Sequence, residues 1–402
     1  TSIAATDAAE GGHEDEDTGN IYLEGGTITI AVTADAAKGI KAAGDLIVSE
    51  PEATAPLTVT VTTSGGGVWD STKLKTKASS CLGADGNMTI SGGTLNLTSS
   101  GGGGKGINVD GTLTFNGGTT TINTKGSAIG YNNSSIVTIT SSQTLDGYDS
   151  DYKSSPKGIK VDGEIIVNSG TINVTTSGVG GEGIESKTSI TFNGGYTYVS
   201  SYDDGINASY NTTTNGSGDL TVNDGYIYCI SSGNDAMDSN GNFYVKGGLI
   251  YAIGCGGAEK SLDANTEERK ALYISGGTLI AVGDLEGGAS ITNGTCKYTD
   301  SWTKNSWFAL YNGGTLAAAF KTPATGSNTG GGGGPWGGGS SSLKLIVYTS
   351  GTPTLKSAVT VSGGEEILGG TVNIGATVTG GSDVSLSNYS SQSGGGGGGG
   401  RR

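Results

Sequence analysis

Short blocks of sequence recur along most of the chain, and this repetition limits the possible folds more than any other feature. The blocks KGINVDGTLTFNGG (105–118) and KGIKVDGEIIVNSG (157–170) align without a gap. Further copies start at 80, 182 and 235, a partial copy starts at 38, and copies carrying insertions start at 204 and 260. The starts between 80 and 260 are 22 to 31 residues apart, if Ser127 begins one more copy.

A repeat of roughly 25 residues, built from short strands and Gly-rich bends, is typical of a stacked parallel fold. A strand of a few residues cannot bury a face alone, but repeats stacked about 4.8 Å apart share backbone hydrogen bonds. We therefore predict an all-β chain that forms a right-handed parallel β-helix, a solenoid, with a C-terminal β appendage or cap. A propeller is disfavoured because its repeats are longer and contain four antiparallel strands each.

Changes in composition along the chain predict five segments. They are an acidic N-terminal tail (1–19), the parallel β-helix (20–324), a Gly-rich loop (325–342), C-terminal strands that continue or cap the solenoid (343–393), and a disordered Gly-rich tail (394–402).

The third position of each block is apolar, which predicts an inward-facing ladder of side chains. Its members are Ile40, Leu82, Ile107, Ile129, Ile159, Ile184, Ile206, Met237 and Leu262.

The charge of the chain narrows its partners. With 22 basic and 37 acidic residues the formal net charge is −15, which disfavours nucleic acid and anionic membrane surfaces. The single histidine, His13, lies in the acidic tail, so most histidine-based catalysis is disfavoured. No apolar run in this sequence is long enough to span a membrane, and we expect no signal peptide within it. We expect a mature or trimmed chain that is monomeric.

Carboxylates gather at the same bend of consecutive repeats. The first position is lysine or serine in the early copies, acidic at Glu182, Asp204 and Asp235, and lysine again at Lys260. The fourth position is uncharged or lysine in the early copies (Gly83, Asn108, Gly130, Lys160) and then reads Glu185, Asn207, Asp238 and Asp263. Equivalent side chains on stacked repeats lie about 5 Å apart, so like charges there repel one another unless a cation intervenes.

Calcium, which takes six to eight oxygen ligands, suits such a column better than magnesium does. The predicted ligands are Glu182, Glu185, Asp203, Asp204, Asn207, Asp235, Asp238 and Asp263. A solvated acidic face with no bound ion is the alternative.

Tyrosines form a second outward-facing column on the following strand. They are Tyr196, Tyr198, Tyr226, Tyr228 and Tyr251. Exposed aromatic rings in a row suit stacking on sugar rings, which makes these residues candidate carbohydrate contacts. Cross-strand stabilisation of the sheet explains the same pattern equally well.

The G-G-T-[IL]-x-[IVL] strands and K/D-G-I bends of residues 20–300 resemble a family of secreted bacterial carbohydrate-binding β-helix proteins. That resemblance implies binding of calcium, cellulose and acidic sugar polymers such as polygalacturonate. The fold of that family is similar to the calcium-dependent pectate lyases of polysaccharide lyase family 9, in which a D-D-x-x-D element binds calcium and a lysine is the base. The nearest elements in this chain are DDGIN (203–207) and NDAMD (234–238), and the resemblance implies Lys260 as the base.

Three functions follow as competing hypotheses. The first is an extracellular calcium-binding protein that recognises a plant-type polysaccharide, either pectin (polygalacturonate) or cellulose. The second is a calcium-dependent pectate lyase that uses Lys260, and the third is a structural or adhesive cell-surface protein. We expect an extracellular or cell-surface location, with a lipid-anchored cysteine before Thr1 as one means of attachment.

Overall fold

The computed structural model describes residues 3–5, 19–51, 55–210, 216–324 and 343–390. Within these ranges the chain is almost entirely strand, so the all-β prediction is confirmed. Helical structure there is limited to the short helix α1 (Ser142–Asp146) and two 3-10 turns, η1 (Ser150–Tyr152) and η2 (Thr266–Glu268). Most of the acidic tail with His13, the loop 325–342 and the tail 394–402 lie outside the described residues.

Sheet A consists of eight parallel strands, and most of them begin at the Gly-Ile-like start of a sequence block. They are β1 (Ile3–Ala5), β4 (Lys38–Ala42), β9 (Ser80–Ala84), β12 (Lys105–Val109), β17 (Lys157–Val161), β19 (Glu182–Ser186), β21 (Ile206–Ala208) and β23 (Met237–Ser239).

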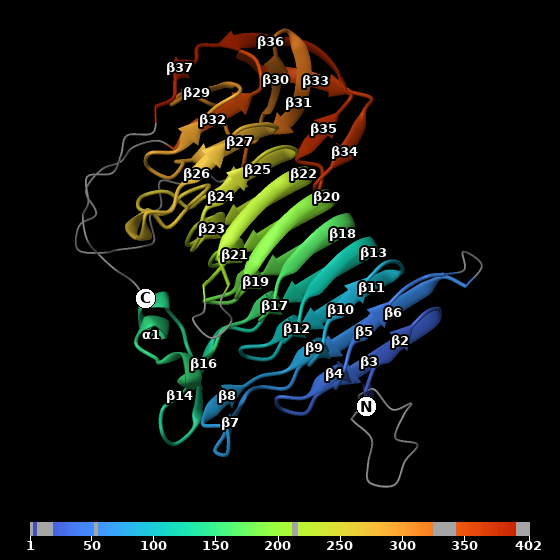
Figure 1. The fold of residues 1–402 in the computed structure, drawn as a ribbon. Helices are drawn as coiled ribbons and strands as arrows, with labels where there is room; N and C mark the ends of the chain where they lie inside the picture. The colour runs from blue at the N-terminus through green and yellow to red at the C-terminus, as the bar shows by residue number, and fades with distance from the viewer. Residues whose placement is uncertain (1–2, 6–18, 52–54, 211–215, 325–342, 391–402) are drawn as a thin grey trace.

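Sheet B contains the strands on either side of the Gly-Gly bends, and Figure 1 shows them stacked along the length of the molecule. In the first half of the chain they are β2 (Ile21–Leu23), β3 (Gly26–Val32), β5 (Leu46–Val48), β6 (Leu57–Thr63), β10 (Met88–Ile90), β11 (Thr94–Ser99), β13 (Leu113–Thr124) and β18 (Ile165–Thr176). The later ones are β20 (Ser189–Ser201), β22 (Asp219–Ser231), β24 (Phe243–Val245), β25 (Leu249–Ile253), β26 (Leu272–Ile274), β27 (Thr278–Gly283), β28 (Ser290–Ile291), β29 (Thr295–Thr299), β32 (Lys344–Thr349) and β37 (Ser387–Asn388).

The pairing within sheet B changes direction near its end. Pairing is parallel through β28, whereas β32 pairs antiparallel with both β27 and β29.

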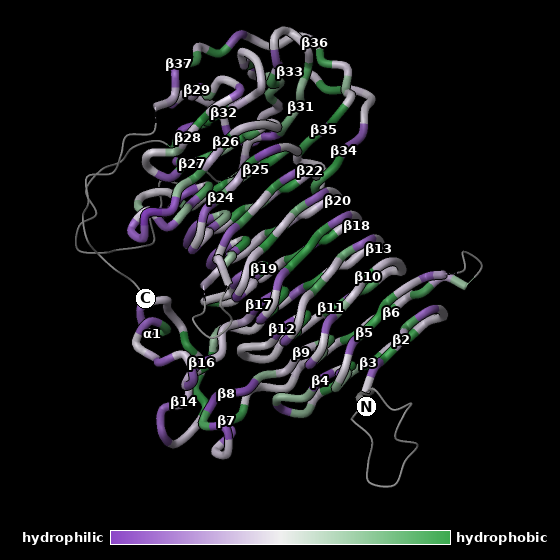
Figure 2. The backbone as a smooth tube through the Cα atoms, viewed as in Figure 1, coloured by the Kyte–Doolittle hydropathy of each residue, from purple (hydrophilic) through white to green (hydrophobic). Residues whose placement is uncertain are grey.

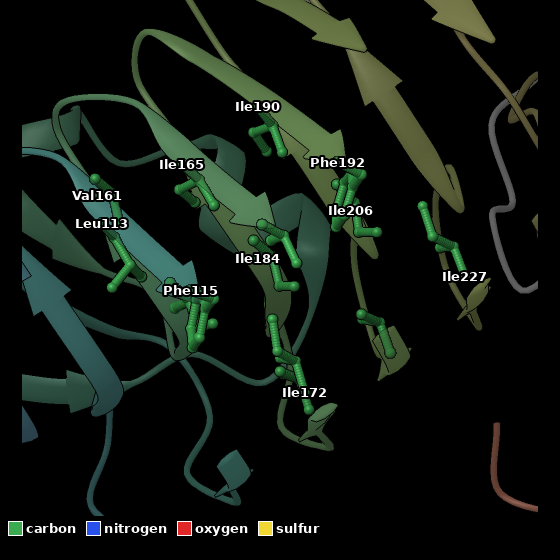
Figure 3. Packing of buried hydrophobic residues seen from close by; sticks show 14 of the residues in the cluster. Leu113, Phe115, Val161, Ile165, Ile172, Ile184, Ile190, Phe192, Ile206 and Ile227 are labelled. Atoms are coloured by element: carbon green, nitrogen blue, oxygen red, sulfur yellow. The ribbon is translucent and has the colours of Figure 1, made fainter. Parts of the chain in front are cut away.

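The predicted apolar ladder is buried between the two sheets. Ile107 pairs in register with Leu82 on one side and with Ile159 on the other, and all three side chains are fully buried. Figure 3 shows Ile184 and Ile206 from sheet A in one cluster with Ile165, Ile190 and Ile227 from sheet B. One expected member is wrong: Ile129 belongs to neither sheet, because β12 pairs directly with β17.

Residues 125–156 form an insertion that leaves the parallel stack, at the lower left of Figure 1. Its three strands, β14 (Ile129–Tyr131), β15 (Ile136–Thr138) and β16 (Lys153–Ser154), pair antiparallel. The hairpin formed by β7 (Val68–Asp70) and β8 (Lys75–Lys77) lies beside it. The predicted repeat starting at Ser127 is therefore part of this insertion.

Glycine at the second block position allows the backbone of sheet A to touch the side chains of sheet B. A Cβ on Gly183 would lie 2.3 Å from Val199 Cγ1 and 2.3 Å from the carbonyl oxygen of Gly205. A Cβ on Gly158 would lie 2.2 Å from Val174 Cγ1. Such separations are far below van der Waals contact, so these positions exclude any side chain.

Asparagines form a hydrogen-bonded ladder at the Gly-Gly bends. The Nδ2 of Asn168 donates to Asn116 Oδ1 (2.8 Å), Asn193 donates to Asn168 (2.9 Å), and Asn223 donates to Asn193 (2.8 Å). Each amide thus bonds the equivalent residue of the preceding repeat, which ties successive bends together.

A separate antiparallel sheet covers the outer face of sheet B near the C-terminal end. Its strands are β30 (Trp307–Asn312), β31 (Thr315–Lys321), β33 (Pro353–Ser362), β34 (Glu365–Ile367), β35 (Val372–Ile374) and β36 (Thr377–Val384). Phe308 and Phe320 from this sheet join Tyr251 and Ile280 from sheet B in a second apolar cluster. Strands of this sheet contain green, hydrophobic segments in Figure 2, at the top of the view.

We expect Gly183→Ala to lower the free energy of unfolding by about 1–3 kcal/mol, because a new methyl group is forced into a filled contact. Urea or thermal denaturation measures the loss. The matched control is Gly147→Ala, where the nearest atom to an added Cβ is 3.4 Å away and φ is negative. Equal stability of the two variants would contradict the close approach of the sheets.

Candidate functional site

The register of sheet A places the predicted acidic residues in adjoining columns on one surface. Lys160 pairs with Glu185, Glu185 with Asn207, and Asn207 with Asp238. A bridge from Met237 to Leu262 continues the stack and places Asp263 after Asp238. The groups that offset the negative charge of these carboxylates differ from one end of the columns to the other.

Lysines neutralise the end of the column formed by Glu182 and Glu185. Lys157 Nζ lies 2.6 Å from Glu182 Oε1 and 2.8 Å from Glu185 Oε2, and Lys187 pairs with the other oxygen of Glu185. Burial alone would raise the pKa of Glu185, but the two lysines hold it well below the ordinary value. These two carboxylates, predicted as metal ligands, thus already have cationic partners.

Lys157 takes part in this ion-pair network because it stands one repeat before Glu182 at the same block position. Burial would lower its pKa, but Glu182 and Glu185 raise it above the ordinary value. Lys187 was missed by sequence reasoning, although it follows Glu185 by two residues and therefore faces the same side of the strand.

Side-chain amides compensate the middle of the column. Asn207 Nδ2 donates to Asp204 Oδ2 (2.9 Å), and Asn234 Nδ2 donates to Asp203 Oδ1 (3.0 Å). Asp204 is 8% exposed, and its pKa is well above the ordinary value because of burial and the neighbouring carboxylate of Asp238. The Oδ1 atom of Asn207 is buried and accepts no hydrogen bond from the described residues.

Three carboxylates meet at the far end of the column. Asp235, Asp238 and Asp263 each offer an oxygen, and these oxygens all lie within 4.8 Å of one another. None of the ion pairs formed within the described residues includes any of the three. Asp235 accepts a hydrogen bond from the backbone N–H of Lys260, the residue implied as a base.

The pKa values of these three groups are raised. Burial, with Asp238 and Glu259 nearby, raises the pKa of Asp235 to about 8. Burial and the surrounding glutamates raise that of Asp238 to about 6, and burial with a hydrogen bond to Glu286 raises that of Asp263 to about 10. Without a cation, therefore, the folded chain retains protons here.

The tyrosine column lies under the C-terminal sheet rather than in solvent. Tyr198 and Tyr228 stack with ring centroids 5.0 Å apart, as do Tyr196 and Tyr226. The expected exposure is wrong for Tyr228 (6% exposed) and for Tyr251 (0%). Tyr251 packs edge-on against Phe320 and donates its hydroxyl hydrogen to the carbonyl of Lys321 (2.9 Å).

Tyr196, Tyr198 and Tyr226 are half-buried at the edge of this apolar contact. A role for them in binding carbohydrate remains a prediction. The rings of Tyr228 and Tyr251 are buried in the apolar cluster and are not accessible to a sugar. The column therefore serves in part to attach the C-terminal sheet to sheet B.

Two further stacked pairs of aromatic rings lie away from the tyrosine column. Tyr244 and Tyr273 pair in register on β24 and β26 and stack at 5.2 Å, and Tyr273 is 39% exposed. Both tyrosines occupy the same block position, so the repeat alignment could have predicted that they lie side by side. Trp69 stacks on Tyr131 at 4.3 Å in the insertion, where no repeat pattern could have indicated it.

Comparison with known families places these features in context. Residues 2–130 and 153–375 match the family described as carbohydrate-binding domain-containing proteins. The chain belongs to this family. Neither a search of curated proteins nor a search of solved structures found a match.

Membership of the family supports carbohydrate binding as the function, with a polysaccharide as the expected partner. No helix within the described residues is long and apolar enough to cross a membrane.

We expect Lys157→Met to destabilise the protein by about 3–5 kcal/mol, because it leaves Glu182 and Glu185 buried with less compensating charge. Lys160→Met removes a more exposed ion pair with Asp162 and should cost only about 0–1 kcal/mol. Chemical denaturation of both variants measures the difference, and similar losses would contradict the network around Lys157.

The raised pKa values predict that calcium-free protein becomes less stable as the pH rises. The folded chain retains protons on Asp238 and Asp235 up to about pH 6 and 8, whereas the unfolded chain releases them near the ordinary pKa of 3.8. The unfolded state thus binds fewer protons, and stability falls from about pH 4 upward. Melting temperatures in chelator at pH 5 and pH 8 test this; an equal or higher value at pH 8 would contradict it.

Proposed function

We propose that this chain is an extracellular or cell-surface polysaccharide-binding protein that uses calcium held by Asp235, Asp238 and Asp263. The observation that carries the proposal is this cluster of three carboxylates, which form no ion pair with a lysine among the described residues, in a chain of a carbohydrate-binding family. At the other end of the columns, Lys157 neutralises the carboxylates of Glu182 and Glu185. Carboxylates at equivalent block positions therefore have a lysine partner at one end and none of the described ion pairs at the other.

The arrangement of the sheets supports a right-handed parallel β-helix as the scaffold. Each repeat adds a strand to sheet A and then to sheet B, and the next repeat pairs parallel to it in both. Chain segments that leave one parallel strand and return to the next do so with right-handed crossovers in nearly all proteins. Stacked repeats of this kind would hold ligands from consecutive turns at a fixed spacing.

The donor set suits calcium. The three aspartates supply only oxygen, and Asp204 with the orphaned Oδ1 of Asn207 lies one repeat earlier in the same columns. The thiol of Cys255 stays protonated, because burial and the nearby carboxylates raise its pKa to about 12, so it is a poor ligand for a soft metal. Extracellular calcium is abundant enough to fill a site of modest affinity.

An acidic polymer such as polygalacturonate fits this site better than a neutral one. A protein with a net charge of −15 repels uronate groups on its own. Calcium bound to the aspartates would offer its remaining coordination positions to a uronate carboxylate. Cellulose, the other expected polymer, would instead need aromatic contacts such as Tyr244 and Tyr273.

A pectate lyase is the second candidate, and the position of Lys260 favours it. Its backbone N–H bonds Asp235, so the lysine sits beside the carboxylate cluster. Bound calcium would offset the negative charge of the carboxylates beside this lysine. A structural or adhesive role is the third candidate, favoured by the hydrogen bonds that already join Asp203 to Asn234 across repeats.

The test is retention on immobilised polygalacturonate with calcium and with chelator. We expect binding only with calcium, and Asp238→Asn should weaken it by roughly tenfold or more, because calcium affinity depends on ligand charge. The control Asp162→Asn removes an acid of the same surface that pairs with Lys160, and should bind normally. Retention of the polymer in chelator would refute the role of calcium.

The same incubations separate the three candidates. Product that absorbs in the ultraviolet and disappears in Lys260→Met would establish a lyase. A calcium-dependent rise in melting temperature without retention on pectin or cellulose would favour the structural role. Calcium that neither stabilises the protein nor promotes binding would refute the metal site.

A further inference from the structure

The insertion at 125–156 contains a pocket of about 390 Å³ that is separate from the acidic columns. Three aromatic rings line it, from Tyr131, Tyr148 and Tyr152, and polar groups come from Asn132, Asn133 and Asp149. No hydrogen bond between described residues uses the hydroxyl groups of the three tyrosines, which leaves them available to a ligand. The volume lies within the range of small-molecule sites.

Packing against the parallel stack holds the pocket in shape. Leu145 of α1 is buried with Ala128 and Ile139, and a Cβ on Gly180 would lie 2.5 Å from Leu145 Cδ2. The ring of Tyr148 covers Gly130, where an added Cβ would meet it at 2.5 Å. The insertion is thus fixed both to the neighbouring repeat and within itself.

The β7–β8 hairpin supports the aromatic wall from behind. Trp69 stacks on Tyr131 at 4.3 Å and lies 4.9 Å from the ring of Tyr152. Thr76 Oγ1 donates to the carbonyl of Tyr152 (3.0 Å). The Oδ1 of Asn132 accepts hydrogen bonds from the backbone N–H groups of Ser134 and Ser135, which shapes the loop beside it.

We propose that this pocket binds a ring of a neutral sugar. Aromatic rings with free hydroxyls offer a flat apolar surface and a polar edge, which matches a sugar's C–H face and its hydroxyl groups. The amides and Asp149 can pair with further hydroxyls. No basic residue lines the pocket and the carboxylate of Asp149 does, so a uronate or phosphate ligand is disfavoured.

The family match adds an independent argument. It omits residues 131–152, and every residue that lines the pocket falls in that omitted segment. The pocket is therefore an addition to the common fold, built on a loop where ligand specificity can change without disturbing the stack. This inference rests on the proposed polysaccharide-binding function, to which it adds a second site for a different class of sugar.

Calorimetric titration with cellopentaose, xylopentaose, mannopentaose and tetragalacturonate tests the proposal on the full chain. We expect at least one neutral oligosaccharide to bind without calcium, and Tyr131→Ala and Tyr152→Ala each to weaken it by roughly tenfold. Tyr22→Ala, which removes a tyrosine that is 59% exposed elsewhere, should bind normally. Tyr148→Phe keeps the ring and removes one hydroxyl, so it reports on the site even where an alanine variant fails to fold.

Calcium-dependent retention on polygalacturonate, measured on the same variants, separates this inference from the proposed function. Loss of neutral-sugar binding in the pocket variants with normal retention supports both. Absence of neutral-sugar binding by the unmodified chain, or binding unaffected by the alanine variants, overturns the pocket. Pocket-dependent neutral-sugar binding without any calcium-dependent retention overturns the calcium site and leaves the pocket standing.

Discussion

The close approach of sheets A and B at the second block position is the contact on which the rest of the structure depends. Glycine at this point lets the backbone of one sheet touch the branched side chains of the other, as Gly183 does with Val199. In one repeat the second block position is Ala236 instead of glycine. The facing residue of sheet B, which is Val199 and then Cys229 in the two preceding repeats, is there the smaller Ala252. Cys81 is an exception, because it stands at the second block position although the facing residue of sheet B is the large Leu97. The contact fixes how each repeat sits on the last, and hence the register of every column on the surface.

An enforced register has an electrostatic consequence. Residues at one block position are brought to the spacing of neighbouring strands, where carboxylates raise each other's pKa and their repulsion opposes folding. The chain meets this cost in three ways along one surface: lysines beside Glu182 and Glu185, amides beside Asp203 and Asp204, and retained protons or a cation at Asp235, Asp238 and Asp263. The three aspartates are the part of the columns at which we propose a bound calcium ion.

The repeat alignment predicted the apolar ladder and the acidic columns because both depend only on block position. It failed at Ser127, where a similar string of residues pairs antiparallel within an insertion. It also failed for Tyr228 and Tyr251, which alternate outward as expected but are covered by strands more than 50 residues later in the chain. A side chain that points outward from a sheet is exposed only when no other element packs on that face of the sheet. A local sequence pattern does not indicate whether such packing occurs.

The amino-acid sequence by itself determined the all-β class, the spacing of the repeats and the in-register columns, because a Gly-Ile start, a period-two alternation and a Gly-Gly bend are local properties of each block. Only the tertiary structure decided which carboxylates share a lysine, which tyrosines are buried, and where an aromatic pocket opens beside the stack. Those outcomes depend on contacts between Lys157 and the next repeat, between Tyr251 and Phe320, and between Trp69 and Tyr131. Such partners lie tens of residues apart, and no residue's own sequence neighbours specify them.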